Sequence, residues 1–160
     1  MSGRVGSFGL AAAIFSLDRA TKHWINDRVT AFDNWPIIPG YFNIIHSENY
    51  GMAFSLLADA PGPLRSFLLV GVSGAVLAFV AWLLWTWTGG WSPQRIALSV
   101  VLGGAAGNIC DRIVRGSVTD FLDVHVGEYH WPTFNVADAA ITTGALMIFL
   151  DLLLNPERRR

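Results

Sequence analysis

Three long apolar stretches dominate the chain and set its expected architecture. They run from Leu64 to Trp87, from Gln94 to about Arg112 and from Phe134 to Leu154. A helix that crosses a membrane needs about 20 mostly apolar residues. Each stretch is close to that length, and no charged residue occurs between Arg65 and Arg95. The pattern therefore predicts three membrane-spanning helices.

A fourth apolar stretch, from Val5 to Ile25, is interrupted near its end by Asp18, Arg19 and Lys22. It has one alternative interpretation as a secretory signal peptide, in which a basic start precedes a short apolar run, but no small-residue cleavage motif follows it. We expect instead a spanning helix whose charged side chains face the protein interior. The predicted fold class is a mainly helical membrane protein with four transmembrane helices, in a single domain over residues 1–160.

The two long connections, residues 26–63 and 113–133, contain signs of extended structure. Residues 41–46 read Tyr-Phe-Asn-Ile-Ile-His, and aromatic and β-branched residues of this kind are typical of strands. Further extended pieces are expected around Val118 and around Val124–Val126. We predict a small β-sheet that lies on the outer membrane surface.

Composition agrees with a membrane location. Hydrophobic residues make up 52% of the 160 residues and charged residues 14%, against about 25% charged in soluble domains. The mean hydropathy is +0.42. The net charge of −1 argues against nucleic acid as a partner. The single cysteine, Cys110, excludes a disulfide framework.

The distribution of basic residues predicts the orientation, because loops rich in Lys and Arg stay in the cytoplasm. With four spans, both termini lie on one side. That side carries Arg4, Arg95, Arg158, Arg159 and Arg160, and the other side carries Arg28, Arg65, Arg112 and Arg115 together with most acids. The C-terminal arginines favour cytoplasmic termini, so the two long connections should face outward.

Several polar residues are spaced to share a helix face. Asp18 and Lys22 are four residues apart with the acid first, the favourable order for a helical ion pair. A structural pair is the simpler interpretation and a direct chemical role is the alternative. Asn108 precedes Asp111 by three residues, so both can face one interior. Arg112 could support structure, take part in catalysis, or pair with a loop or an anionic lipid head group.

Small residues recur at a spacing of four in two of the predicted spans. Gly103 and Gly107 form such a pair, and so do Gly71 with Ala75 and Gly74 with Ala78. Small residues at this spacing let helix backbones approach closely in membranes. We expect all three pairs to serve helix packing.

Acidic residues at the edges of the apolar stretches are the main chemical candidates, because a carboxylate beside a bilayer is expensive to keep. Asp138 lies three residues after Asn135, in the first turn of its helix, and Asp120 lies in the preceding connection. Two carboxylates brought close cannot both ionise cheaply, so one pKa rises. Such a pair could supply one base and one acid, as in aspartic proteases. The alternatives are that the two never meet, or that Asp111 is the second carboxylate.

A metal site is the other possibility that the residue types allow. His125, Glu128 and His130 lie close in sequence, but their spacing suits neither a helix-borne zinc pair nor a zinc finger. We expect solvated loop residues and no metal or other cofactor. No serine nucleophile motif, phosphate loop or dinucleotide fingerprint occurs.

Taken together, five short motifs resemble those of the lipoprotein signal peptidases, the bacterial signal peptidase II family. In chain order they are Asp-x-x-Thr-Lys at 18–22, Asn-x-Gly-x-Ala-Phe at 49–54, Gly-Asn-x-x-Asp-Arg at 107–112, Val-x-Asp-Phe at 118–121 and Phe-Asn-x-Ala-Asp at 134–138. Met52 stands where the family usually has Ala. The resemblance covers nearly the whole chain.

The resemblance implies a four-helix aspartyl endopeptidase of the bacterial inner membrane with a small periplasmic β-cradle. It implies cleavage of prolipoprotein signal peptides just before the diacylglyceryl-modified cysteine. The catalytic pair would be Asp120 and Asp138. Residues expected to bind substrate or support the site are Asp18, Lys22, Asn49, Gly51, Asn108, Asp111, Arg112 and Asn135. The expected partners are lipidated prolipoproteins and membrane phospholipid, and the expected oligomeric state is a monomer.

Two rival functions make different predictions. A proton-coupled transporter would place acids near the bilayer midplane, with broken helices or internal repeats. The acids here lie near predicted helix ends and no repeat is visible. A non-enzymatic assembly factor would have no reason to gather acids at one membrane face.

Overall fold

The computed structural model of the chain describes residues 2–51 and 62–155. Four helices and four strands occur in this part, in the order α1 (Ser2–Arg28), β1 (Asn34–Ile38), β2 (Phe42–Asn49), α2 (Gly62–Thr86), α3 (Pro93–Arg115), β3 (Val118–Val126), β4 (Tyr129–His130) and α4 (Val136–Leu154). The part of the second motif from Met52 to Phe54 lies outside the described residues.

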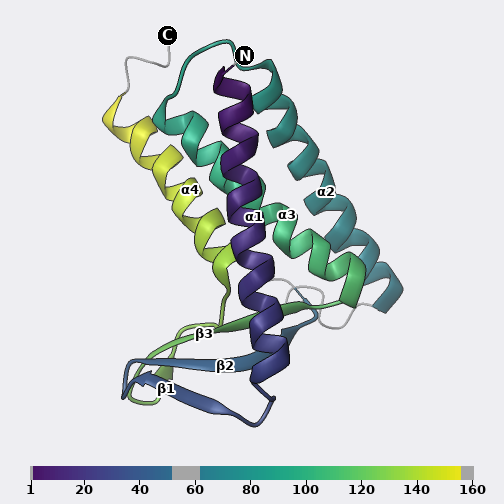
Figure 1. Cartoon of the computed structure of the whole chain (residues 1–160), viewed down its shortest axis with the longest axis vertical. Coiled ribbons are helices and arrows are strands. Elements are labelled where there is room, and N and C mark those ends of the chain that lie inside the picture. Colours follow the sequence, from purple (N-terminus) through teal and green to yellow (C-terminus); the bar gives the residue numbers. More distant parts are fainter. Residues whose placement is uncertain (1, 52–61, 156–160) are drawn as a thin grey trace.

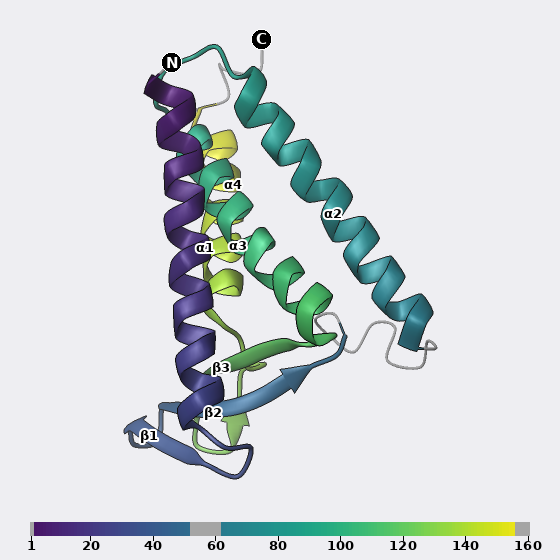
Figure 2. The same ribbon diagram turned by 45° about the vertical axis from the view of Figure 1, so that its right-hand side comes forward.

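The helices stand side by side above a small sheet, with the beginning of α1 and the end of α4 far from it (Figure 1). Helix α3 packs against α1, α2 and α4, while α1 and α2 have few contacts with each other. In the rotated view α2 leans away from the other helices toward the sheet end (Figure 2). Helix α3 is therefore the central element on which the other three are placed.

Residues lacking a side chain allow α3 to approach its neighbours closely. A Cβ atom on Gly104 would lie 2.6 Å from the carbonyl oxygen of Ala137 on α4. A Cβ on Gly103 would lie 2.8 Å from Cβ of Ile14 on α1. Real Cβ atoms do not approach so closely, so both helix contacts depend on glycine. The packing role expected for the small residues of α3 is confirmed.

The same expectation is wrong for α2. A Cβ atom on Gly71 or on Gly74 would meet no atom of the described residues within 4 Å. The physical reason is the lean of α2, which carries this part of the helix away from its neighbours (Figure 2). Small residues four apart permit close packing but do not require it.

Helix ends follow local sequence signals. Ser92 begins α3 by accepting a hydrogen bond from the backbone N–H of Arg95, with Pro93 at the first helical position. Gly116 ends α3 with a φ of 79°, a left-handed conformation that glycine adopts without strain. The chain can therefore turn directly from α3 into the sheet.

The sheet is antiparallel, with strand order β1-β2-β3-β4. Strands occur at 42–49 and 118–126, where extended segments were expected from the sequence. Ile25 and Val29 near the end of α1 pack with Phe121 of β3 in a buried apolar cluster. This cluster fixes the sheet to the end of α1.

Three of the described helical segments are long and apolar enough to cross a membrane: Phe67–Thr86, Pro93–Arg115 and Val136–Leu154. The fourth expected span forms a continuous helix, α1, which extends beyond the predicted boundaries at both ends. Its charged residues keep it out of the apolar set. The observed class is a mainly helical protein with three apolar candidate spans and a small antiparallel sheet.

Candidate active site

Asp120 lies on β3, the strand that contacts α1 and α3. The register between β2 and β3 shifts after the pair Ile44–Leu122 and resumes at the pair Ser47–Asp120. Two residues of β2 therefore oppose one residue of β3, which defines a β-bulge, and bulges redirect nearby side chains. Asp120 is only 3% exposed.

Asp138 is positioned by the beginning of α4. Asn135 caps this helix, because its side-chain oxygen accepts a hydrogen bond of 2.9 Å from the backbone N–H of Asp138. The backbone N–H of Ala137, which has no partner within the first turn of the helix, donates a hydrogen bond of 2.9 Å to Asp18 of α1. The positive end of the helix dipole favours negative charge at both positions.

Three asparagine side chains donate hydrogen bonds to the two carboxylates. Asn135 Nδ2 donates to Asp120 Oδ1 at 2.6 Å, and Asn49 Nδ2 donates to Asp120 Oδ2 at 3.0 Å. Asn108 Nδ2 donates to Asp138 Oδ1 at 2.7 Å. Asn135 Nδ2 also lies 3.3 Å from Asn108 Oδ1, which joins the two halves. The network supplies hydrogen bonds to two acids without adding positive charge.

Asp138 lies close enough to Asp120 to affect its ionisation. Burial raises the pKa of Asp120 to about 6, the hydrogen bond from Asn49 opposes this rise, and the negative charge of Asp138 adds to it. A carboxyl group shifted in this way is partly protonated near neutral pH. The pair can therefore offer one acid and one base at the same time.

A cluster of charges lies beside this pair, between α1 and α3. The ammonium of Lys22 lies 2.9 Å from Asp18 Oδ2 and 2.8 Å from Asp111 Oδ2, and all three side chains are at most 1% exposed. Asp111 also pairs with Arg19. The ion pair expected from the spacing of Asp18 and Lys22 is present, and Asp111 has two basic partners.

Gly107 is the residue that lets the charge cluster approach α3. A Cβ atom at this position would collide with the carboxylate of Asp18. The Gly-Asn pair at 107–108 thus combines a close approach with a hydrogen-bonding side chain.

Arg112, one turn further on, donates to the carbonyl oxygens of Gly51, at 3.2 Å, and of Asn108, at 3.4 Å. Gly51 in turn donates its N–H to Asn49 Oδ1 at 3.0 Å.

The structure thus gathers every residue that was predicted for the site from the sequence. Two participants were missed. Arg19 precedes Lys22 by three residues, so the helical spacing alone could have placed it near Asp111. Thr119 is fully buried, and its carbonyl oxygen lies 3.4 Å from Asn135 Nδ2. Nothing in the sequence indicates that backbone contact.

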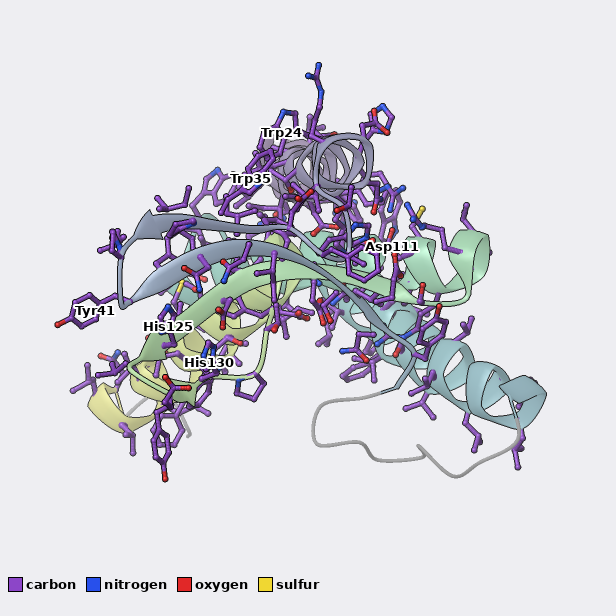
Figure 3. The ribbon with its side chains drawn as sticks, turned by 90° about the horizontal axis from the view of Figure 1, so that it is seen from below. Trp24, Trp35, Tyr41, Asp111, His125 and His130 are labelled. Carbon is purple, nitrogen blue, oxygen red and sulfur yellow. The ribbon has the colours of Figure 1, made fainter. Side chains whose placement is uncertain are left out.

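The two histidines of the possible metal site lie elsewhere on the sheet. His125 and His130 are cross-strand neighbours on β3 and β4, with rings stacked at 4.6 Å, so they are strand residues and not loop residues. His130 Nδ1 lies 2.7 Å from Asp123 Oδ1. Figure 3 shows both histidines well apart from Asp111. Among the described residues no three His, Cys, Asp or Glu side chains are grouped for metal binding.

Known proteins resemble the chain in both sequence and fold. The family described as signal peptidase (SPase) II matches residues 10–154. The chain is 45% identical over 159 residues to a lipoprotein signal peptidase of Solibacter usitatus, covering 96% of this chain and 93% of the relative. It is 41% identical over 150 residues to a lipoprotein signal peptidase of Cellvibrio japonicus, covering 92% of this chain and 86% of the relative.

Solved structures agree with these sequence matches. A bacterial membrane enzyme solved in meso at 2.3 Å resolution superimposes with a TM-score of 0.83 at 25% identity, covering 97% of this chain and 92% of that one. A second, solved in meso at 1.9 Å resolution, gives a TM-score of 0.80 at 27% identity, with 92% of each chain covered. On these matches, which extend over nearly its whole length, the chain belongs to the signal peptidase II family.

Proposed function

We propose that this protein is a membrane aspartyl endopeptidase that removes signal peptides from diacylglyceryl-modified prolipoproteins by cutting before the lipidated cysteine. Membership of the signal peptidase II family supports the activity. The observation that carries the mechanism is the pair Asp120 and Asp138, two acids from different elements joined through Asn135 and Asn108.

In the proposed reaction, one carboxylate of the pair is ionised and the other is protonated. The ionised group accepts a proton from a water molecule, whose oxygen attacks the carbonyl carbon of the peptide bond. The protonated group then donates its proton to the nitrogen as the carbon–nitrogen bond breaks, so the products are a carboxylic acid and an amine. The raised pKa of Asp120 supports a pair in which one carboxyl group acts as acid and the other as base. The chemistry needs no metal or other cofactor.

The proposal includes a definite placement in the bacterial inner membrane. Helix α1 is the fourth span, its charges facing α3 and α4, and both chain ends are cytoplasmic. The sheet and the aspartate pair then lie on the periplasmic side, where a lipid-anchored substrate presents its cleavage site at the membrane surface. We expect a monomer. We also expect contact with membrane phospholipid, because the exposed faces of α2 and α4 are rich in apolar side chains.

The test of this function is cleavage of a lipidated precursor by purified protein carrying Asp120→Asn or Asp138→Asn. Each substitution keeps the side-chain shape but removes the ability to exchange a proton, so each should abolish cleavage. Asp123→Asn is the matched control, since Asp123 is a buried aspartate of the same strand that pairs with His130. It should retain activity. Turnover by a well-folded Asp120→Asn protein would reject the assignment and make Asp111 the second carboxylate.

A further inference from the structure

The side-chain amide of Asn108 has one defined orientation, and Lys22 sets it. An asparagine oxygen only accepts hydrogen bonds and its nitrogen only donates, whereas a lysine ammonium only donates. Lys22 Nζ lies 2.9 Å from one end of the Asn108 amide, so that end is Oδ1. The other end, Nδ2, must then face Asp138, at 2.7 Å.

Three oxygens surround the ammonium of Lys22. Asp18 Oδ2 lies 2.9 Å from Nζ, Asp111 Oδ2 lies 2.8 Å from it, and Asn108 Oδ1 accepts a hydrogen bond of 2.9 Å. An ammonium has three N–H donors, one for each of these oxygens. Asn108 is the neutral partner of the three, and it is hydrogen-bonded to Asp138.

The other two asparagines of the site have the same kind of restraint from a different source. The oxygen of Asn135 accepts the backbone N–H of Asp138, and the oxygen of Asn49 accepts the backbone N–H of Gly51. Backbone N–H groups also only donate. Each amide nitrogen is thus directed at a carboxylate. Asn108 differs because side chains, and not the backbone, donate to its oxygen: Lys22 at 2.9 Å and Asn135 at 3.3 Å.

Taking these contacts together, we propose that Lys22 is a positioning residue of the reaction, which acts on Asp138 through the amide of Asn108. This inference rests on the proposed function. Without Lys22 the Asn108 oxygen loses its hydrogen bond of 2.9 Å and, among the described residues, keeps only the longer contact of 3.3 Å from Asn135 Nδ2, which also donates to Asp120 Oδ1 at 2.6 Å. It can then turn its oxygen toward Asp138, which removes one hydrogen bond from the carboxylate and adds a repulsive contact. A role limited to neutralising Asp18 and Asp111 would leave Asn108 unaffected.

The chain offers a matched control on the same helix. Arg19 and Lys22 both pair with Asp111, and only Lys22 contacts Asn108. Removing either cation removes a charge partner of Asp111, but only the loss of Lys22 frees the amide. Because Lys22→Met alone leaves buried acids short of a partner and can prevent folding, Lys22→Met with Asp18→Asn keeps the charge balanced. The asparagine at position 18 retains an oxygen for the N–H of Ala137.

The first measurement reads the amide directly and involves no turnover. Protein labelled with ¹⁵N-asparagine in detergent gives side-chain amide signals, and the Asn108 pair is identified by its loss in Asn108→Ala. These signals should shift in the balanced double variant by much more than in Arg19→Met. Equal shifts in the two proteins, or no shift in the double variant, would overturn the inference.

The second measurement is cleavage of a lipidated precursor. The balanced double variant should lose kcat by about tenfold or more, since small misplacement of a reacting group has effects of that size, while KM changes by less than about twofold. In an Asn108→Ala background the same double change should cost less than about twofold. Equal losses in both backgrounds would show that Lys22 does not act through Asn108. Failure of the wild-type protein to cleave would instead reject the proposed function, and the amide measurement would still stand.

Discussion

At the scale of single residues, Asp120 combines deep burial with full hydrogen bonding. It is 3% exposed, and each of its two oxygens accepts a hydrogen bond from an asparagine amide. Loss of water nevertheless outweighs these bonds, so the pKa of Asp120 rises to about 6. The folded protein is therefore less stable when Asp120 is ionised than when it is protonated.

The raised pKa of Asp120 predicts how stability depends on pH. The unfolded carboxyl ionises near 3.8 and the folded one near 6. The folded state thus binds more protons in this range, and stability falls as pH rises from about 4 to above 6, by about 3 kcal/mol in total. The Asp120→Asn protein has no carboxyl group at this position, so it does not lose this stability as pH rises. Its melting temperature, compared with that of the wild type, should rise between pH 4 and pH 7.

Asp123 is the control for this prediction, because its pKa shifts in the opposite direction. The pKa of Asp123 is lowered, because hydrogen bonds from His130 and Asn43 and the charge of the two nearby histidines together outweigh its burial. Asp123 therefore stabilises the fold above its ordinary pKa, and this contribution is lost in acid. Asp123→Asn should cost more stability at pH 5 than at pH 2, because the contribution is lost below the ordinary pKa of 3.8. Parallel trends for the two variants would contradict the assigned ionisation of Asp120.

The pair should also govern the pH dependence of catalysis. A reaction that needs one protonated and one ionised carboxyl group has a bell-shaped profile, whose limbs belong to the pair and not to either residue. The raised pKa of Asp120 places one limb far above the ordinary value for an aspartate. Measured profiles of kcat/KM should therefore show an apparent pKa of about 6.

At the scale of elements, close contact between α3 and α4 places Asp138. Gly104 of α3 faces the first turn of α4, where a Cβ would lie 2.6 Å from the carbonyl oxygen of Ala137 and 3.2 Å from Cβ of Ala140. Any larger side chain at 104 must push the beginning of α4 away. Such a substitution therefore disturbs both the packing of α3 on α4 and the position of the neighbouring Asp138.

This contact gives a matched pair of glycine substitutions. Gly104→Val should lower the free energy of unfolding by about 1–3 kcal/mol, the usual cost of overpacking, and should reduce cleavage as well. Gly71→Val places the same side chain on α2, where no described atom lies within 4 Å. It should change stability by less than about 0.5 kcal/mol. Thermal melting in detergent measures both, and equal destabilisation would contradict the packing described for α3.

Elements were more predictable from the sequence than the contacts between them. The apolar stretches predicted all four helices, and the spacing of Asp18 and Lys22 predicted their pairing, because both signals are local. The hydrogen bond from Lys22 to Asn108 joins residues 86 positions apart, so no helical periodicity could reveal it. The failed expectation for Gly71 has the same origin, since the lean of α2 depends on its neighbours.

At the scale of the whole molecule, α1 is longer than a bilayer is thick. Its 27 residues span about 40 Å at 1.5 Å per residue, against about 30 Å for the hydrocarbon core. Ile25 in the last turn of α1, and Val29 just after it, pack on Phe121 of the sheet. Asp18 and Lys22 lie in the half of α1 that leads to the sheet, and they contact Ala137 and Asn108 beside the aspartate pair. The beginning of α1 and the end of α4 lie at the other end of the molecule (Figure 1).

Because the sheet lies at one end of the molecule, the orientation in the membrane can be tested at two exposed positions. Glu128 lies in the turn between β3 and β4. Gly90 belongs to the connection between α2 and α3, which lies at the end of the molecule where α1 begins and α4 ends (Figure 1). The arginines near the termini favour the cytoplasm for that end. In a Cys110→Ala background, single cysteines at these positions can be treated with a membrane-impermeant maleimide in intact bacteria. The cysteine at 128 should be labelled, and the cysteine at 90 should react only after the cells are opened. The reverse pattern would place the aspartate pair on the cytoplasmic side, where it could not reach a precursor whose cleavage site is exposed outside, and the proposed function would fail together with the topology.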